Sequence, residues 1–262
     1  MQNLHDVMRK PRRWVCGLLL ALFGAAVPAQ VVGGQVVKVA AASNLKGVMD
    51  ELTAMFKAAS VQVTWGASGS LAQQIRQGLP VALFISADEV RVDELVKERQ
   101  TQDAGQRYAT GRLALLVPKD SRLPLEAGLK AVVLALNKQD KLAIANPQLA
   151  PYGIAAVEAL RHEGVESQAQ TQFVLGENIA QTTNFVVTGA AQAGITALSL
   201  AQAPEVAQRT RFTRLPAEWH APLHQKMVLL QGAPVQARQF RDFLLSPEAR
   251  AVFRRHGYDT PP

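Results

Sequence analysis

The stretch Val36-Val37-Lys38-Val39-Ala40-Ala41-Ala42-Ser43-Asn44-Leu45 decides the fold class of this chain. Its first seven residues form a mainly apolar run, which we interpret as a buried strand. Ser43 and Asn44 are residue types that favour the N-cap of a helix. Apolar residues then recur with helical spacing at Leu45, Val48, Met49, Leu52, Met55 and Phe56. The stretch therefore predicts a strand that runs into a helix through a polar junction.

The same alternation of apolar runs and helical patterns continues along the chain. We expect further strands at 61–65, 81–85, 113–117, 142–145, 173–174, 194–197 and 227–230. Helices are expected at 71–77, 92–97, 154–162, 178–189, 234–245 and 247–256. This alternation predicts an α/β fold with right-handed crossovers. Ligands of such sheets bind outside the carboxyl ends of the strands, so the strand-to-helix junctions are candidate sites.

The composition is that of an ordinary globular protein. The chain has 262 residues, of which 48% are hydrophobic and 19% charged. That length allows one or two domains with a sizeable core. The composition excludes a disordered chain, a collagen and a disulfide scaffold. The single cysteine, Cys16, lies in the N-terminal leader described next, so the mature chain has no thiol to form a disulfide or bind a metal.

The first 29 residues have the pattern of a secretory signal. The basic residues Arg9, Lys10, Arg12 and Arg13 precede an apolar run at 14–27. Val27 and Ala29 favour cleavage before Gln30. The run is shorter than the roughly 20 residues of a membrane span, with an N-terminal anchor as the alternative. The leader carries +3 of the formal charge of +7, which leaves +4 on the mature chain. That mild charge gives no indication of a nucleic-acid partner, and we expect export to the periplasm.

Four strand-to-helix junctions are rich in hydrogen-bond donors and poor in cations. They are Ser43-Asn44, Gly66-Ala67-Ser68-Gly69-Ser70, Pro151-Tyr152-Gly153 and Glu177-Asn178-Ile179. Helix N-termini offer free N–H groups, and serine and tyrosine add hydroxyls. Taken singly, each junction could be only a helix cap, a turn or a packed side chain. Together they predict a site for a tetrahedral oxyanion held by neutral dipoles.

The scarcity of acidic residues in these junctions bears on the kind of oxyanion. A phosphate monoanion needs an acceptor for its remaining proton, whereas a fully ionised oxyanion needs donors only. The junctions therefore favour a fully ionised oxyanion over phosphate.

An enzyme is the less favoured class. After the leader is removed, the histidines are His162, His220, His224 and His256, and none lies in the four junctions. Pro222 argues against a helical His220/His224 metal pair. Asp88 and Glu89 could form an acid/base pair, although such residues more often cap a helix or fix a contact between lobes. We expect no enzymatic activity, no cofactor and no protein ligand to a metal.

Several ordered motifs resemble the periplasmic molybdate-binding proteins of ABC importers. The resemblance extends from about Val36 to Tyr258, and its motifs are Val39–Leu45, Ser68–Ile75, Phe84–Asp88 and Ala193–Ser199. It implies an α/β fold of two lobes, a type II periplasmic substrate-binding protein with a central cleft and a hinge. It further implies that the oxyanion is clamped between the lobes.

The resemblance also implies the binding residues. Ser43 and Ser68 would give hydroxyl and backbone donors, and Ile179 a backbone N–H. Asn44 and Tyr152 match an asparagine and a tyrosine found in one branch of the family. The sequence departs from some members at Ala197, where they carry a ligand tyrosine. We hypothesise that Tyr152 supplies the missing hydroxyl.

The expected domain organisation and partners follow from the same resemblance. The signal peptide would span 1–29, the first lobe 30–111 plus 221–262, and the second lobe 112–220. A monomer would bind molybdate, with molybdenum present only inside the oxyanion, and tungstate equally because the two are nearly equal in size. The closed form would deliver the oxyanion to an inner-membrane ABC permease. The alternatives are another tetrahedral oxyanion such as sulfate, or a periplasmic enzyme.

Overall fold

The computed structural model describes residues 36–261. The signal peptide predicted at 1–29 and its cleavage point lie outside the described residues. Within residues 36–261, no helix combines the length and the apolar character needed to cross a membrane.

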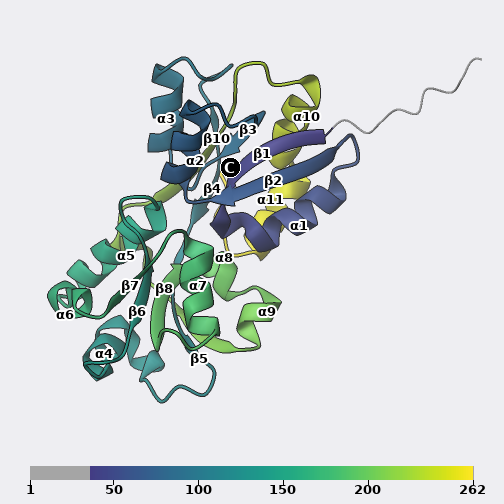
Figure 1. Cartoon of the computed structure of the whole chain (residues 1–262). Helices are drawn as coiled ribbons and strands as arrows, with labels where there is room; N and C mark the ends of the chain where they lie inside the picture. Colours follow the sequence, from purple (N-terminus) through teal and green to yellow (C-terminus); the bar gives the residue numbers. More distant parts are fainter. Residues whose placement is uncertain (1–35, 262) are drawn as a thin grey trace, which may run out of the picture. The chain divides into compact units, whose positions relative to one another are not determined.

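The first of two five-stranded sheets has the strand order β2-β1-β3-β10-β4 (Figure 1). Its strands are β1 (Val36–Ala42), β2 (Ser60–Gly66), β3 (Leu83–Ile85), β4 (Gln106–Gly111) and β10 (Leu223–Leu229). β1 runs parallel to β2 and β3, whereas β10 is antiparallel to β3 and β4. The polar junctions after β1 and β2 therefore lie at the same edge of the sheet.

The second sheet has the order β7-β6-β8-β5-β9. Its strands are β5 (Leu113–Pro118), β6 (Leu142–Ala145), β7 (Phe173–Gly176), β8 (Ala193–Ala197) and β9 (Thr210–Arg214). The chain passes from the first sheet to the second between β4 and β5, and returns between β9 and β10. The described residues pack as one compact unit, and the lobe boundaries at 111/112 and 220/221 stay a prediction.

Side chains of alternate residues in β1 face two different cores, as the two-residue repeat of a strand requires. Val37, Val39 and Ala41 pack in one core, and Ala40 packs in another. The first core contains residues of α1 (Lys46–Met55), α10 (Val235–Leu244) and α11 (Pro247–Arg255). The second contains residues of α2 (Ser68–Arg76) and α3 (Val90–Lys97). Helices thus cover both faces of the first sheet, as Figure 1 shows.

The second sheet is covered in the same manner. Leu113, Leu115 and Val117 of β5 face one core, whereas Ala114 and Leu116 face another. The helices of this part are α4 (Gly128–Ala135), α5 (Pro151–His162), α6 (Glu166–Gln170), α7 (Ile179–Val187), α8 (Leu198–Ala201) and α9 (Pro204–Ala207). Short 3₁₀ turns occupy Ser43–Leu45, Leu125–Ala127 and Ala217–Trp219.

The α/β fold predicted from the alternation is confirmed, and each predicted strand and helix has a counterpart within a few residues. The sequence interpretation missed two strands and several helices. β4 (QRYATG) and β9 (TRFTR) are short and largely polar, so neither produces an apolar run. The apolar run of α4 (GLKAVVLA) is too short to separate a helix from a strand by periodicity.

Candidate functional site

All five predicted binding residues line one small cavity. Its volume, about 10 Å³, is enough for about one water molecule. The remaining lining is small or apolar, and no lining residue carries a charge: Ala42, Gly66, Ala67, Ala87, Ala150 and Pro151. The cavity therefore suits a small ligand that is held by neutral groups.

Each lining side chain lies where a strand ends, as expected for an α/β sheet. In the first sheet, Ser43 and Asn44 follow β1, and Ser68 begins α2 directly after β2. In the second sheet, Tyr152 lies in the first turn of α5 after β6, and Ile179 begins α7 after β7. The first N–H groups of a helix have no acceptor inside that helix, so the starts of α2, α5 and α7 offer donors and a positive potential.

Ser43 connects the two parts of the cavity wall. Its Oγ donates to Asn178 Oδ1 at 3.1 Å and lies 3.4 Å from the Ala180 N–H. Asn178 is the N-cap of α7, and its Oδ1 accepts from the N–H groups of Ala180 and Gln181, both at 3.1 Å. The sequence interpretation placed Asn178 in a junction without assigning it to the site. Its N-cap position was the available signal.

Ser68 is held so that its hydroxyl hydrogen remains available. Its Oγ accepts from the Ala87 N–H at 2.9 Å, and a hydroxyl that accepts one bond can still donate another. The next residue, Gly69, donates its N–H to Leu149 O at 2.9 Å. A Cβ on Gly69 would lie 2.8 Å from that oxygen, so glycine permits the close approach of the two loops.

Tyr152 belongs to a buried polar network behind the cavity. Its hydroxyl oxygen accepts from Gln225 Nε2 at 3.0 Å, and burial raises its pKa well above the usual value near 10. The phenol therefore keeps its hydrogen at neutral pH and can act as a donor. Asn44 Nδ2 donates to Gln225 Oε1 at 3.1 Å and to the Tyr258 hydroxyl at 2.9 Å. Asn44 Oδ1 is buried and has no hydrogen-bond partner in the described part of the chain.

The sequence interpretation did not identify Gln225 or Tyr258. Gln225 occupies the buried face of β10 between Leu223 and Met227, and a glutamine in such a position is an available sign of a buried polar network. Tyr258 follows the last helix, and no local pattern places it near Asn44. Ala197 ends β8 and packs in the core that contains Tyr152.

The residues considered for catalysis serve other contacts. Asp88 Oδ1 accepts from Ser86 Oγ at 3.0 Å and from the Arg91 N–H at 3.1 Å, and burial raises the pKa of its carboxyl. Glu89 instead pairs with Arg107, at 2.6 Å.

The two histidines weighed as a metal pair have separate partners. His220 Nδ1 contacts the Ala221 carbonyl, and His224 Nδ1 contacts Thr110 Oγ1. Residues 36–261 contain no cluster of three or more His, Cys, Asp or Glu residues able to hold a metal ion.

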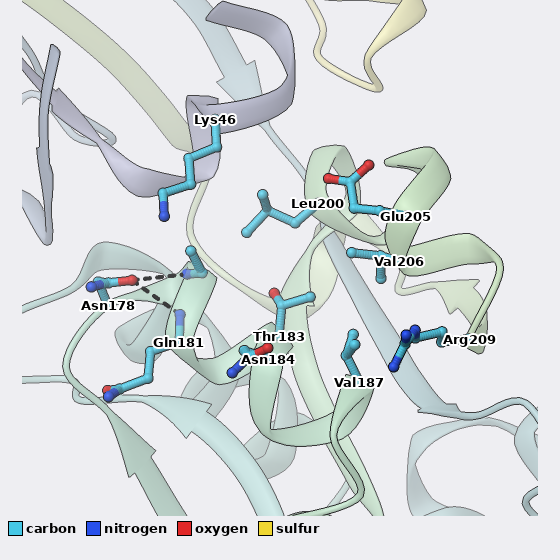
Figure 2. Close-up of a pocket in the computed structure, with 11 residues that line it drawn as sticks. Lys46, Asn178, Gln181, Thr183, Asn184, Val187, Leu200, Glu205, Val206 and Arg209 are labelled. Atoms are coloured by element: carbon cyan, nitrogen blue, oxygen red, sulfur yellow. Dashed lines mark hydrogen bonds between the residues drawn. The ribbon is translucent and has the colours of Figure 1, made fainter. Parts of the chain in front are cut away.

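A larger, open pocket with a volume of about 540 Å³ lies next to the cavity. Figure 2 shows the Lys46 side chain extending from α1 toward the start of α7, where Asn178 caps the helix. Glu205 and Arg209 line the same pocket. Its size and its charged lining residues do not suit the binding of a small oxyanion by neutral donors. A pocket of roughly 300–1,000 Å³ is typical of sites for larger organic molecules. The bond from Ser43 to Asn178 joins its wall to the wall of the small cavity.

Comparison with known proteins supports the same family that the sequence motifs indicate. A family model of bacterial extracellular solute-binding proteins matches residues 37–259. The molybdate-binding protein ModA of Azotobacter vinelandii is 33% identical over 247 residues, which cover 92% of this chain and 96% of that protein. ModA of Rhodobacter capsulatus is 34% identical over 248 residues, with coverage of 92% and 94%.

A solved structure supports the fold independently. The periplasmic molybdate-binding protein of Azotobacter vinelandii matches with a TM-score of 0.76 and 29% identity, over 86% of this chain and 100% of that one. The resemblance seen in the sequence motifs is thereby confirmed, and the chain belongs to the bacterial extracellular solute-binding proteins.

Proposed function

We propose that this chain is the periplasmic solute-binding component of an ABC importer and that its solute is molybdate. The observation that carries the proposal is the convergence of Ser43, Asn44, Ser68, Tyr152 and Ile179 on one small uncharged cavity. The relatives that match over most of the chain are named for molybdate binding. The small cavity agrees with a single inorganic oxyanion as the solute.

Neutral donors would hold the oxyanion. Ser68 would give a hydroxyl, Ile179 its backbone N–H, and Tyr152 its phenolic hydrogen. Ser43 would turn its hydroxyl hydrogen from Asn178 Oδ1 to the oxyanion. The helix starts beside Ser68 and Ile179 add positive potential without a cation. Fixed dipoles can replace the hydration of the oxyanion, and the absence of acidic lining residues favours a fully ionised species.

Selection among oxyanions would follow from the size of the cavity. Tungstate should bind much as molybdate does, because the two ions are nearly equal in size. Sulfate is smaller and could not reach donors on both sides of the cavity equally well. A binding protein for sulfate is therefore the second candidate, and competition between the anions separates the two.

Delivery would depend on closure of two lobes about the crossings near Gly111 and His220. The bound oxyanion touches both lobes and so favours the closed form. Ser199 Oγ, in the proposed second lobe, donates to the Asn44 carbonyl at 2.9 Å, a contact that supports such a closed form. The closed monomer would then dock on an inner-membrane permease.

An enzymatic role is not proposed. Within the described residues, Ser43 and Ser68 are the only serines that line the cavity. Ser43 contacts Asn178 and Ala180, and Ser68 contacts Ala87. A serine nucleophile requires a neighbouring base such as histidine. The contacts made by the two serines agree with binding.

Calorimetric titration of the mature, anion-stripped protein tests the proposed function. Molybdate and tungstate should each bind tightly at one site per chain, with little heat from sulfate or phosphate. Tight binding of sulfate or phosphate would be consistent with an oxyanion site but would overturn molybdate as the proposed solute. Absence of binding by all four anions would overturn the transport function.

A further inference from the structure

Gln225 contacts the cavity wall from behind without lining the cavity. Its side chain belongs to β10 and is fully buried. Nε2 donates to the Tyr152 hydroxyl at 3.0 Å, while Oε1 accepts from Asn44 Nδ2 at 3.1 Å and from the Tyr108 hydroxyl at 2.7 Å. One amide group therefore connects two residues of the cavity wall.

We propose that Gln225 is a positioning residue that directs the Tyr152 hydroxyl hydrogen toward the bound oxyanion; the inference rests on the proposed function. A phenolic hydroxyl has one hydrogen to give and can also accept. Because the Tyr152 oxygen accepts from Gln225 Nε2, its own hydrogen points away from Gln225. Tyr152 lines the cavity, so an oxyanion bound there would offer an acceptor for that hydrogen.

The direction of the Gln225 amide is set by its neighbours. Asn44 Nδ2 can only donate, so the Gln225 atom that faces it has to be the oxygen. The Asn44 amide is set in turn by Tyr258, whose hydroxyl lies 2.8 Å from the Asn44 carbonyl and 3.0 Å from Ser199 Oγ. The Tyr258 hydrogen is used toward those acceptors, so its oxygen accepts from Asn44 Nδ2. The donors thus run from Asn44 to Gln225 to Tyr152 and into the cavity.

The opposite arrangement of both amides would give the cavity a different donor. With the two amides turned over, Gln225 Oε1 would accept the Tyr152 hydrogen, and the Asn44 NH₂ would lie where the unpartnered Oδ1 now lies. Tyr152 would then contribute nothing to the oxyanion. The two arrangements therefore differ in whether the Tyr152 hydroxyl matters for binding, which a mutant series can measure.

A double-mutant cycle with Gln225→Met and Tyr152→Phe tests the positioning role, with molybdate affinity measured by calorimetry. Gln225→Met should weaken binding roughly ten-fold in the unaltered background, because the Tyr152 hydrogen loses its fixed direction. In the Tyr152→Phe background the same substitution should have almost no effect, because the hydroxyl it acts through is gone. A purely structural role would give the same loss in both backgrounds.

Gln172 supplies a matched control. It is also buried, and its Nε2 donates to the Asn137 carbonyl at 2.6 Å, away from the cavity wall. Gln172→Met removes a buried amide of the same kind and should leave molybdate affinity unchanged. A comparable loss of affinity in Gln172→Met would mean that the effect at Gln225 is general destabilisation, and would contradict the proposal.

Gln225→Glu provides a second variant should Gln225→Met fail to fold. Its neutral carboxyl keeps one donor and one acceptor, whereas its carboxylate accepts the Tyr152 hydrogen. Molybdate affinity of Gln225→Glu should therefore fall as pH rises through the pKa of the new carboxyl, and fall less in the Tyr152→Phe background. An equal fall of molybdate affinity in both backgrounds would mean that the new carboxylate only repels the oxyanion, and would overturn the inference.

The outcomes separate this inference from the proposed function. If the unaltered protein binds no oxyanion, both are wrong. If it binds molybdate while the penalties of Gln225→Met and Tyr152→Phe simply add, or Tyr152→Phe has no effect, only the positioning role is wrong.

Discussion

The Ser43 hydroxyl and the Asn178 side chain, 135 residues apart in the sequence, form a hydrogen bond of 3.1 Å. The bond joins the turn after β1 to the N-terminus of α7, where Asn178 caps the helix. The same Asn178 oxygen accepts from Ser43 and from two N–H groups of α7. This one oxygen therefore links the order of α7 to the position of Ser43 in the cavity wall.

Asn178→Ala should lower the stability of the protein and weaken molybdate binding together. Loss of an N-cap costs about 0.5–2 kcal/mol of unfolding free energy. It also loosens the first turn of α7, which carries the Ile179 N–H proposed to bind the oxyanion. Ser246→Ala is the matched control, since Ser246 caps α11 by accepting from the Ala249 N–H at 3.2 Å. Denaturant unfolding and calorimetry should show a similar stability loss in both variants, with reduced affinity in Asn178→Ala only. Unchanged affinity in Asn178→Ala would contradict the role of the Asn178 cap.

Tyr152→Phe should weaken molybdate binding by about 1–3 kcal/mol, the cost of leaving a buried acceptor unpaired. This result would support Tyr152 as the donor that replaces the tyrosine absent at Ala197. Thr210→Val is the control, because Thr210 is buried and its hydroxyl bonds to the Val206 carbonyl at 2.7 Å, away from the cavity. Calorimetric affinity equal to that of the unaltered protein would remove the Tyr152 hydroxyl from the site.

Gly111→Ala should disrupt the site from behind. A Cβ at Gly111 would overlap the Tyr152 hydroxyl and would lie 2.6 Å from Gln225 Nε2, so both side chains have to move. We expect loss of molybdate affinity and a lower unfolding temperature.

Gly47→Ala supplies the contrast to Gly111→Ala. The nearest atom to a Cβ at Gly47 is Ala203 Cβ at 4.0 Å, and alanine is favoured over glycine in a helix by up to about 1 kcal/mol. Its stability should be unchanged or higher, and its affinity unchanged. Equal behaviour of the two variants would contradict the crowding described at Gly111.

The sequence identified the cavity residues because each lies at a strand-to-helix junction. Ser43, Ser68 and Ile179 begin or precede helices, and parallel strands bring such junctions to one edge of a sheet. Chain-local patterns are enough for that inference. Asn44 and Tyr152 lie in the same junctions, and the resemblance to molybdate-binding proteins implied the binding roles of all five residues.

The network behind the cavity could not be predicted in the same way. Gln225 approaches Tyr152 only because β10 returns to the first sheet after the whole of the second sheet has formed. Tyr258 meets Asn44 across a sequence separation of 214 residues. Pairings of that kind depend on tertiary packing and leave no periodic signal in the sequence. The strands β4 and β9 were missed for a related reason: each lies at the edge of its sheet and has no apolar run.

The protein should become less stable above about pH 10 because of its buried tyrosines. Burial raises the pKa values of Tyr108, Tyr152 and Tyr258 above the ordinary value of 10.0. Below pH 10 these phenols are protonated in both states, and above it the unfolded chain loses protons first. The free energy of unfolding then falls by about 1.4 kcal/mol per pH unit for each such phenol.

Denaturant unfolding between pH 8 and pH 11 on the unaltered protein and Tyr152→Phe measures this effect. Comparison of the two cancels the contribution of the lysines. Above pH 10, the unfolding free energy of the variant should fall less steeply with pH, because one buried phenol has been removed. Identical slopes would show that the Tyr152 phenol ionises as readily in the folded protein as in the unfolded chain.

The position of molybdenum in crystals grown with molybdate tests the central claim most directly. Diffraction measured at the molybdenum absorption edge locates the ion without assumptions about its partners. We expect one anomalous peak inside the cavity lined by Ser43, Ser68, Tyr152 and Ile179. A peak beside Lys46 and Arg209 in the open pocket, or no ordered peak in either place, would contradict the account.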